Sequence, residues 1–363
     1  MAELMAQAGV GALLVHGNVA ARQDVQYVCG FPPRHDTYAC LTERGDALFV
    51  QLFNHVANAR EMSAWSDVRW GGIDTGATLA RHLAALALER ERIGLVGQIP
   101  YQQRDRLDTL LPGAAFTDLT PAFRRHRLVK SPEEIEWTRR GAALCDLALE
   151  ALLAAVRPGT TDQELGALVE AAYSRAGGHH TICFLGSASM ADGGRVSPAQ
   201  NWADRLVRAG DIVFIELSAG YGGYTGQVLR TIAVGAQPTP LIQRLHDVAE
   251  AAYTAIVAAI RPGATANELL EAAALIDEAG FTVCDDVVHG YQGGYLPPII
   301  RTPATQHAPL GDLRLEPGMM LVVQPNVVSR DGRHGVQPGQ LVLVTLTGAE
   351  PLHRVPLRLF VRP

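Results

Sequence analysis

The sequence predicts an α/β domain over residues 1–125, followed by an α+β domain over residues 126–363 that is built from duplicated helix-helix-strand units. Three observations lead to this prediction. Short apolar runs alternate with helical patterns in the first third of the chain, a strong helix start follows, and a segment of the second part recurs farther along. With 363 residues, of which 48% are hydrophobic and 19% charged, the chain is long enough to form two cores.

The first domain has the alternating pattern of a partly parallel sheet. Apolar runs at Gly11–Val15, Ala47–Gln51 and Ile93–Gly97 predict strands, and Ala77–Arg90 has the periodicity of a helix. No glycine-rich phosphate-binding motif follows any of these strands, so the sequence gives no support to nucleotide binding. We expect this domain to be structural or to shape the substrate site.

The second domain begins at a helix start that is easily recognised. Ser131 is placed to cap the helix, Pro132 takes its first position, and Glu134 completes a capping box. The helical periodicity then continues to a stop at Arg157-Pro158-Gly159.

An internal repeat organises this second domain. Ala154–Leu165 recurs as Ala258–Leu269, and each copy has an Arg-Pro-Gly helix stop and then a Thr-x-x-Glu capping box that opens another helix. Farther along, the segment that contains Glu216 is similar to the segment that contains Gln324, so these two residues occupy equivalent positions in the two copies. Two such units, related by a pseudo-twofold axis, would place both residues on strands of one curved antiparallel sheet.

Composition limits the partners and the compartment. The net charge of -6 and the pI near 6.1 come without a long basic run, which argues against nucleic acid and against an anionic membrane surface. Five cysteines, an odd number without a Cys-x-x-Cys pair, favour a reducing cytoplasm over a disulfide framework. No apolar run approaches the roughly 20 residues of a membrane span. We expect a cytoplasmic protein whose partner is a small molecule or a second copy of itself.

The stretch Gly210–Thr231 is the centre of the predicted site. A Gly-Asp turn leads into an apolar strand that carries one acid, Glu216, and a Gly/Tyr bend returns the chain into a second strand that ends at Arg230-Thr231. A buried carboxylate is costly unless it is paired. Glu216 is therefore either a functional group or the partner of Arg230 in a structural ion pair across the bend.

These motifs, together with Val288-His289-Gly290 and Pro317-Gly318-Met319, resemble the pita-bread superfamily of aminopeptidase P, prolidase, methionine aminopeptidase and creatinase. The resemblance implies a creatinase-type N-terminal domain over residues 1–125 and a pita-bread domain over residues 126–363. It also implies a site between the pseudo-symmetric halves. The expected assembly is a homodimer in which the N-terminal domain of one subunit lies near the site of the other.

The resemblance also identifies the positions at which the peptidases of this superfamily bind two divalent metals, through two Asp, one His and two Glu. On this chain four of them fall on Glu216, Gln227, His289 and Gln324, and the fifth falls near Gly339, in the segment Gly335–Gln340. Two dications need several anionic oxygen ligands, and neutral amides are weak substitutes. We therefore expect neither metal nor another cofactor. The catalytic histidine of creatinase falls on Ala199, and the superfamily's substrate-side histidine falls on Leu296.

The predicted catalytic residues are His289 and Glu216. His289 would act as acid and base, and Glu216 would tune its pKa or act as base itself, with its own pKa raised by burial. Gln227 and Gln324 either fill the vacated metal positions as an amide pair or bind a polar substrate. Tyrosines beside glycines either pack or offer hydroxyl groups to the substrate; they are Tyr221, Tyr224, Tyr291 and Tyr295.

Four further residues are candidates for substrate binding. Arg34 belongs to a loop that in creatinase-like dimers reaches the neighbouring subunit's site, where its guanidinium would bind a carboxylate. A solvated loop charge is the equally weighted alternative. Three further candidates are His180, Arg195 and His334. The first of them follows a helix stop and another histidine, and such adjacent histidines also occur without a functional role.

The favoured interpretation is a metal-independent, creatinase-like enzyme. It would cleave a C–N or related bond of a small polar compound, with a carboxylate expected, by His/Glu acid-base chemistry. One alternative is a catalytically silent pita-bread pseudoenzyme used for binding. Another is an Xaa-Pro-type metallopeptidase, which requires a different alignment of the ligand positions.

Overall fold

A computed structural model describes all residues, 1–363, and the chain divides into two compact units, Met1–Arg127 and Leu128–Pro363. The division falls close to the boundary predicted between residues 125 and 126. Each unit is described by itself below. None of the helices combines the length and the apolar character that a membrane-spanning helix needs.

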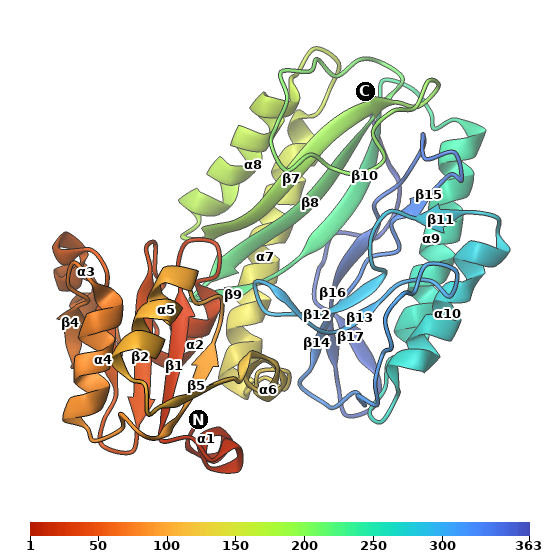
Figure 1. The fold of residues 1–363 in the computed structure, drawn as a ribbon. Helices are drawn as coiled ribbons and strands as arrows, with labels where there is room; N and C mark the ends of the chain where they lie inside the picture. Colours follow the sequence, from red (N-terminus) through yellow and green to blue (C-terminus); the bar gives the residue numbers. More distant parts are fainter. The chain divides into compact units, whose positions relative to one another are not determined.

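The N-terminal unit is a six-stranded mixed sheet with helices around it (Figure 1). Pairs β1/β2 and β2/β3 are antiparallel, whereas β1/β5, β3/β4 and β5/β6 are parallel. The strands, in the order β4-β3-β2-β1-β5-β6, are β1 (Ala12–Gly17), β2 (Thr37–Thr42), β3 (Ala47–Val50), β4 (Val68–Trp70), β5 (Arg92–Val96) and β6 (Ala115–Asp118). The partly parallel α/β sheet predicted for this part of the chain is confirmed.

Helices cover both faces of this sheet because the strand residues alternate between two apolar clusters. Leu13 and Val15 of β1 belong to one cluster, and Ala12 and Leu14 to the other. The helices are α1 (Ala2–Ala8), α2 (Gln23–Cys29), α3 (Val56–Met62), α4 (Thr75–Ala85), α5 (Tyr101–Leu110) and α6 (Thr120–His126), with a 3-10 turn at Phe53–His55.

The C-terminal unit is organised by a ten-stranded sheet whose main path is β13-β12-β14-β16-β10-β8-β7. Its strands are β7 (His179–Ser189), β8 (Asp211–Tyr221), β9 (Tyr224–Thr225), β10 (Val228–Val234), β12 (Val288–Tyr291), β13 (Tyr295–Ile300), β14 (Met320–Val323), β16 (Gly339–Val344), β17 (Ala349–Pro351) and β18 (Phe360–Arg362). A separate pair is formed by β11 (Thr282–Val283) and β15 (Val327–Val328). The curved sheet is drawn from green to blue in Figure 1.

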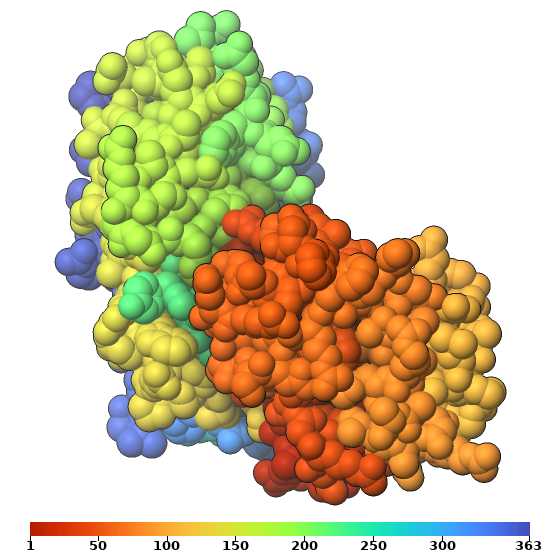
Figure 2. Space-filling view, turned by 90° about the vertical axis from the view of Figure 1, so that its left-hand side faces the viewer, coloured from red at the N-terminus to blue at the C-terminus, as the bar shows by residue number.

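Two helix pairs pack against this sheet, one from each copy of the internal repeat. They are α7 (Pro132–Ala155) with α8 (Asp162–Arg175), and α9 (Pro240–Ala259) with α10 (Ala266–Glu278). Each pair has its own apolar cluster with strand residues. Yellow-green residues of the first pair and its neighbouring strands form much of the C-terminal unit's surface in Figure 2. The duplicated helix-helix-strand units predicted from the repeat are confirmed.

The helix starts in this unit are fixed by capping boxes. The side chains of Ser131, Thr161 and Thr265 each accept a hydrogen bond from the backbone three residues on, and a glutamate at that position bonds back to the capping residue. The two threonines occupy equivalent positions in the repeat. These caps fix the starts of α8 and α10 at equivalent positions of the repeat, and β7 and β12, which follow these helices, lie toward opposite ends of the main path of the sheet.

Candidate functional site

The strand-bend-strand segment that the sequence predicted forms two neighbouring strands of the sheet, β8 and β10. β8 and β10 pair antiparallel with Glu216 opposite Leu229, and Gly222 and Gly223 between the strands adopt positive φ angles of 58° and 92°. Such angles are easily adopted only by glycine, so the bend is encoded locally. Gln227 lies just before β10, on the same side of the pleated sheet as Glu216 because positions alternate along a strand.

A chain of hydrogen bonds links Glu216 to the second half of the repeat. Gln227 Nε2 donates to Glu216 Oε1 at 2.8 Å and lies 3.5 Å from Gln324 Oε1. Gln324 Nε2 in turn approaches the backbone oxygen of Asp286 at 3.4 Å and its Oδ2 at 3.5 Å. Both glutamine side chains are fully buried. The structure therefore brings together three of the predicted residues and adds one that was not predicted.

His289 lies beside this chain, and its ring is fully buried. Its Nδ1 is 3.0 Å from the backbone oxygen of Gly290, which can only accept, so Nδ1 carries the hydrogen and Nε2 of the neutral ring is an acceptor. Nε2 has no hydrogen-bond partner and lies 4.0 Å from Asp286 Oδ2. The ring stacks on Tyr295 with centroids 4.1 Å apart.

Burial lowers the pKa of His289 to about 4, and the bond to Gly290 opposes this shift only in part. The histidine is therefore neutral at pH 7. The role of His289 as acid and base stays a prediction, and in the neutral form its Nε2 can accept a proton. No hydrogen bond joins it to Glu216, so the predicted tuning of His289 by Glu216 is not seen.

Asp285 and Asp286 are the site residues that sequence reasoning missed. Burial, with the charge of Asp285 next, raises the pKa of Asp286 to about 8. Burial and Asp285 likewise raise the pKa of Glu216 to about 7, against the hydrogen bond from Gln227. The raised pKa predicted for Glu216 is thus found. Two adjacent acids before the apolar pair Val287-Val288 were the available signal in the sequence.

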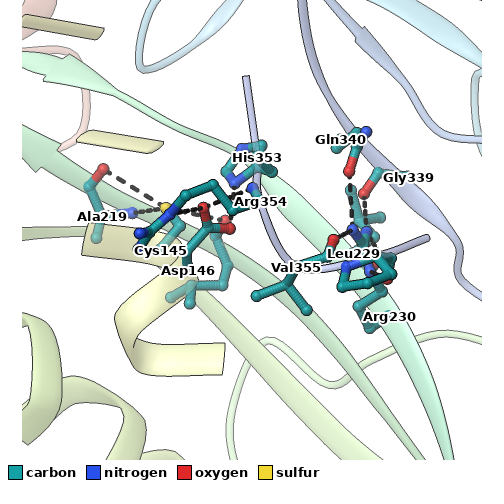
Figure 3. A network of polar contacts seen from close by, with 12 residues as sticks. Cys145, Asp146, Ala219, Leu229, Arg230, Gly339, Gln340, His353, Arg354 and Val355 are labelled. Atoms are coloured by element: carbon teal, nitrogen blue, oxygen red, sulfur yellow. Dashed lines mark hydrogen bonds and ion pairs between the residues drawn. The ribbon is translucent and has the colours of Figure 1, made fainter. Parts of the chain in front are cut away.

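Arg230 does not pair with Glu216, so the structural ion pair considered from the sequence is wrong. Arg230 is opposite Ile215 in the register, one position away from Glu216, and successive positions face opposite sides of the sheet. Figure 3 shows its fully buried guanidinium on a different set of partners. It donates to the backbone oxygens of Leu229, Gly339, Val355 and Pro356 and to Gln340 Oε1.

A second group in Figure 3 joins α7 to the end of the chain. Asp146 accepts from the backbone nitrogen of Arg354 at 2.8 Å, and its Oδ1 lies 3.0 Å from His353 Nδ1. The Cys145 sulfur accepts from the backbone nitrogen of Ala219 at 3.1 Å. The contacts of Asp146 and Arg230 thus hold residues 353–356 to α7 and β10, and the contact of Cys145 joins α7 to β8.

The tyrosines divide between the site and other contacts. Tyr291 is buried, its ring is edge-on to His289 at 5.5 Å, and its hydroxyl donates to Ser218 Oγ. Tyr224 instead donates to Glu134 Oε1 on α7. The hydroxyl of Tyr221 accepts from Arg140, also on α7. Of the three, only Tyr291 contacts the Glu216–His289 group.

The remaining candidates lie elsewhere. His180 contacts Tyr173 and Glu170 of α8. Arg195 is exposed and packs over Gly186 of β7. The backbone of His334 bonds to Ser329 in its own loop. Arg34 is exposed in the N-terminal unit, between α2 and β2. The structure shows no contact between the three C-terminal residues and the Glu216–His289 group.

Comparison with known proteins extends over both units. Residues 136–346 match the sequence model of metallopeptidase family M24, and residues 1–129 match that of the creatinase/prolidase N-terminal domain. The chain belongs to metallopeptidase family M24. The pita-bread fold and the superfamily resemblance inferred from the sequence are thereby confirmed.

Three similar proteins illustrate the family. The chain is 30% identical to the probable dipeptidase PepE of Mycobacterium tuberculosis over 246 residues, which are 67% of this chain and 63% of PepE, so the match spans less than two thirds of that relative. It is 26% identical to the Xaa-Pro dipeptidase of Pyrococcus furiosus over 340 residues, 92% of each chain. The crystal structure of an X-Pro aminopeptidase from Thermotoga maritima shares the fold, with a TM-score of 0.86 at 20% identity over 99% of this chain and 98% of that chain.

These relatives contradict the function that was predicted from the sequence. The metal-independent, creatinase-like enzyme for a small polar compound has no counterpart among them, because the similar proteins are named dipeptidases and Xaa-Pro dipeptidases of a metallopeptidase family. The prediction of a metal-independent enzyme depended on five ligand positions, whereas the similarity to these peptidases extends over most of the chain. The Xaa-Pro-type alternative agrees better with the relatives.

The residues at the centre nevertheless do not fit a pair of divalent metals. Of the positions that the resemblance assigns to the metal pair, Glu216 and His289 keep ligand side chains, and the others are two neutral amides and Gly339. Even with Asp285 and Asp286 nearby, no group of three or more His, Cys, Asp or Glu is arranged to hold a metal ion. A Cβ atom at position 339 would lie 2.8 Å from Gln324 Cα and 2.9 Å from its Cβ. The backbone therefore has no room at this position for the side chain of a ligand.

Proposed function

We propose that this protein binds short peptides and hydrolyses them, with Xaa-Pro dipeptides as the first candidates. The observation that supports this proposal most directly is the two-way match to the Pyrococcus Xaa-Pro dipeptidase, which covers 92% of each chain. The dipeptidase name of the Mycobacterium relative points to the same size of substrate. At the centre of the sheet, the buried Glu216–Gln227–Gln324 chain offers polar groups to a peptide.

A second candidate, peptide binding without hydrolysis, is favoured by one observation. Family M24 is named for metal-dependent peptidases, and Gly339 and the two amides do not suit metal binding. A protein that keeps the fold and the central polar residues can still recognise a peptide. It would then act as a binding module.

The two candidates are separated by measuring release and binding together. Purified protein is incubated with alanyl-proline, with and without Mn²⁺, and free proline is quantified by chromatography while the melting temperature is followed in parallel. Release of proline supports hydrolysis, and stabilisation without release supports the binding module. Absence of both would contradict the proposal in either form. The same measurements are made on the isosteric variant Glu216→Gln. Its control is Glu271→Gln, at an exposed residue of α10.

We further propose a cytoplasmic homodimer, with a small peptide as its partner and no nucleic acid. Support for a reducing compartment comes from the five cysteines, all of which are free. Sedimentation equilibrium tests the dimer, and a molar mass equal to that of one chain at micromolar concentration would contradict it.

A further inference from the structure

The polar group at the centre of the sheet has several hydrogen-bond acceptors that no donor satisfies. Gln227 is 1% exposed, and its Oε1 has no partner although its Nε2 is bound to Glu216. His289 is 0% exposed, and its Nε2, an acceptor in the tautomer fixed by Gly290, also has none. Buried acceptors without donors cost free energy unless a ligand satisfies them.

The same group contains acids without a basic partner. No ion pair joins Glu216, Asp285 or Asp286 to an arginine or lysine, and His289, 4.0 Å from Asp286 Oδ2, is neutral at pH 7. The donors that do reach these residues carry no charge: the side-chain amides of Gln227 and Gln324, the hydroxyl of Tyr295 and the backbone N–H of Asp286. A bound molecule that brings both hydrogen-bond donors and positive charge would complete the group.

We propose that this group binds a protonated primary amine, the α-ammonium group of a peptide, at the positions where the family places its metal pair. An ammonium group has three N–H donors and no acceptor, which suits Glu216, Gln227 Oε1 and His289 Nε2. One positive charge also suits these three carboxyl groups better than the four charges of two dications would. The inference rests on the proposed function, because a peptide is the ligand that carries this amine.

Solvent can reach the group from one side. Glu216 and Asp285 are partly exposed, and Tyr295, which stacks on His289, is 44% exposed. The aromatic face of Tyr295 adds a surface that is attractive to a cation.

The test compares two ligands that differ only at the amine. Alanyl-proline and N-acetyl-alanyl-proline are titrated into the wild-type protein by calorimetry, and KM replaces Kd for a ligand that is hydrolysed. Acetylation removes the charge, so we expect affinity to fall by about 10-fold or more, the usual loss for a charge-assisted hydrogen bond. Glu216→Gln should weaken alanyl-proline by a similar factor and leave the acetylated ligand unchanged. Glu271→Gln should change neither.

Each outcome decides between the inference and the proposed function. Equal binding of the two ligands would overturn the ammonium site while peptide recognition stands. Unchanged affinity for alanyl-proline in folded Glu216→Gln would overturn it as well. If neither ligand binds or is hydrolysed, the proposed function itself fails. Retention of two equivalents of Mn²⁺ or Zn²⁺, measured by elemental analysis after dialysis, would show that metals occupy these positions and would overturn the inference.

Discussion

Replacing Glu216 by glutamine should stabilise the protein at alkaline pH and leave its stability unchanged in acid. The side chain is partly buried beside Asp285, and its pKa is raised from 4.5 to about 7. Below pH 4.5 the carboxyl is protonated in both the folded and the unfolded state, so it makes no difference to stability. As pH rises from 4.5 to 7, the unfolded state ionises first, and the free energy of unfolding falls.

The size of this effect follows from the shift. One pKa unit corresponds to 1.36 kcal/mol, so the full shift gives about 3 kcal/mol at pH 8, and solvent screening of the partly exposed side chain reduces this to about 1–3 kcal/mol. Glutamine keeps the shape and cannot ionise. The difference in unfolding free energy, variant minus wild type, should therefore be near zero at pH 4.5 and reach its largest positive value at pH 8.

The assay is urea denaturation of both proteins at several pH values between 4.5 and 8. Taking the difference between variant and wild type removes the contributions of other titrating groups, Asp286 among them. Glu271→Gln, on the exposed side of α10, should give a difference that does not vary with pH. A Glu216→Gln protein that is less stable than wild type at pH 8 would refute the reasoning, because the ionised carboxylate would then have a stabilising partner.

Three further predictions follow from the packing and the ligand set. Gly339→Ala should lower the free energy of unfolding, measured by urea denaturation, by about 1–3 kcal/mol because its Cβ would meet Gln324 at 2.8 Å. The control is Gly348→Ala, where the nearest atom is 3.9 Å away and the loss should be small. Equal losses in the two variants would contradict the steric argument. Arg230→Met should lower the free energy of unfolding by roughly 3 kcal/mol or more, since several buried acceptors lose their donor. The control is Arg354→Met, at a mostly exposed side chain. An Arg230→Met protein as stable as wild type would show that these acceptors find other partners. Added Mn²⁺ or Zn²⁺ should leave the melting temperature unchanged, and a rise in that temperature that saturates with metal concentration would contradict the misfit of the ligand set.

The fold could be predicted because its signals are local. Capping boxes at Thr161 and Thr265, the glycine bend before Tyr224 and the repeated helix stops each lie within a few residues. Repetition of the same signals in the second half indicated the pseudo-symmetric sheet.

The site was predicted only in part because its contacts are distant in sequence. Gln227 and Glu216 lie on one hairpin, so their proximity could be anticipated, but Asp286 reaches Gln324 only through the pairing of β12 with β14. The partner of Arg230 depends on which face of the pleat it occupies, and a shift of one position reverses that face. The low pKa of His289 depends on burial, which a single histidine in a sequence does not reveal.

The close approach of Gly339 to Gln324 also limits how the protein can change. A designer who wished to install a metal centre here could not begin with a carboxylate at position 339, because the backbone at Gln324 occupies the space that even a methyl group needs. The order of substitutions matters: β14 and β16 would have to separate first, and that step alone offers no new ligand. A single carboxylate substitution at position 339 is thus disfavoured by sterics, and directed evolution toward metal binding should proceed through paired changes in these two strands.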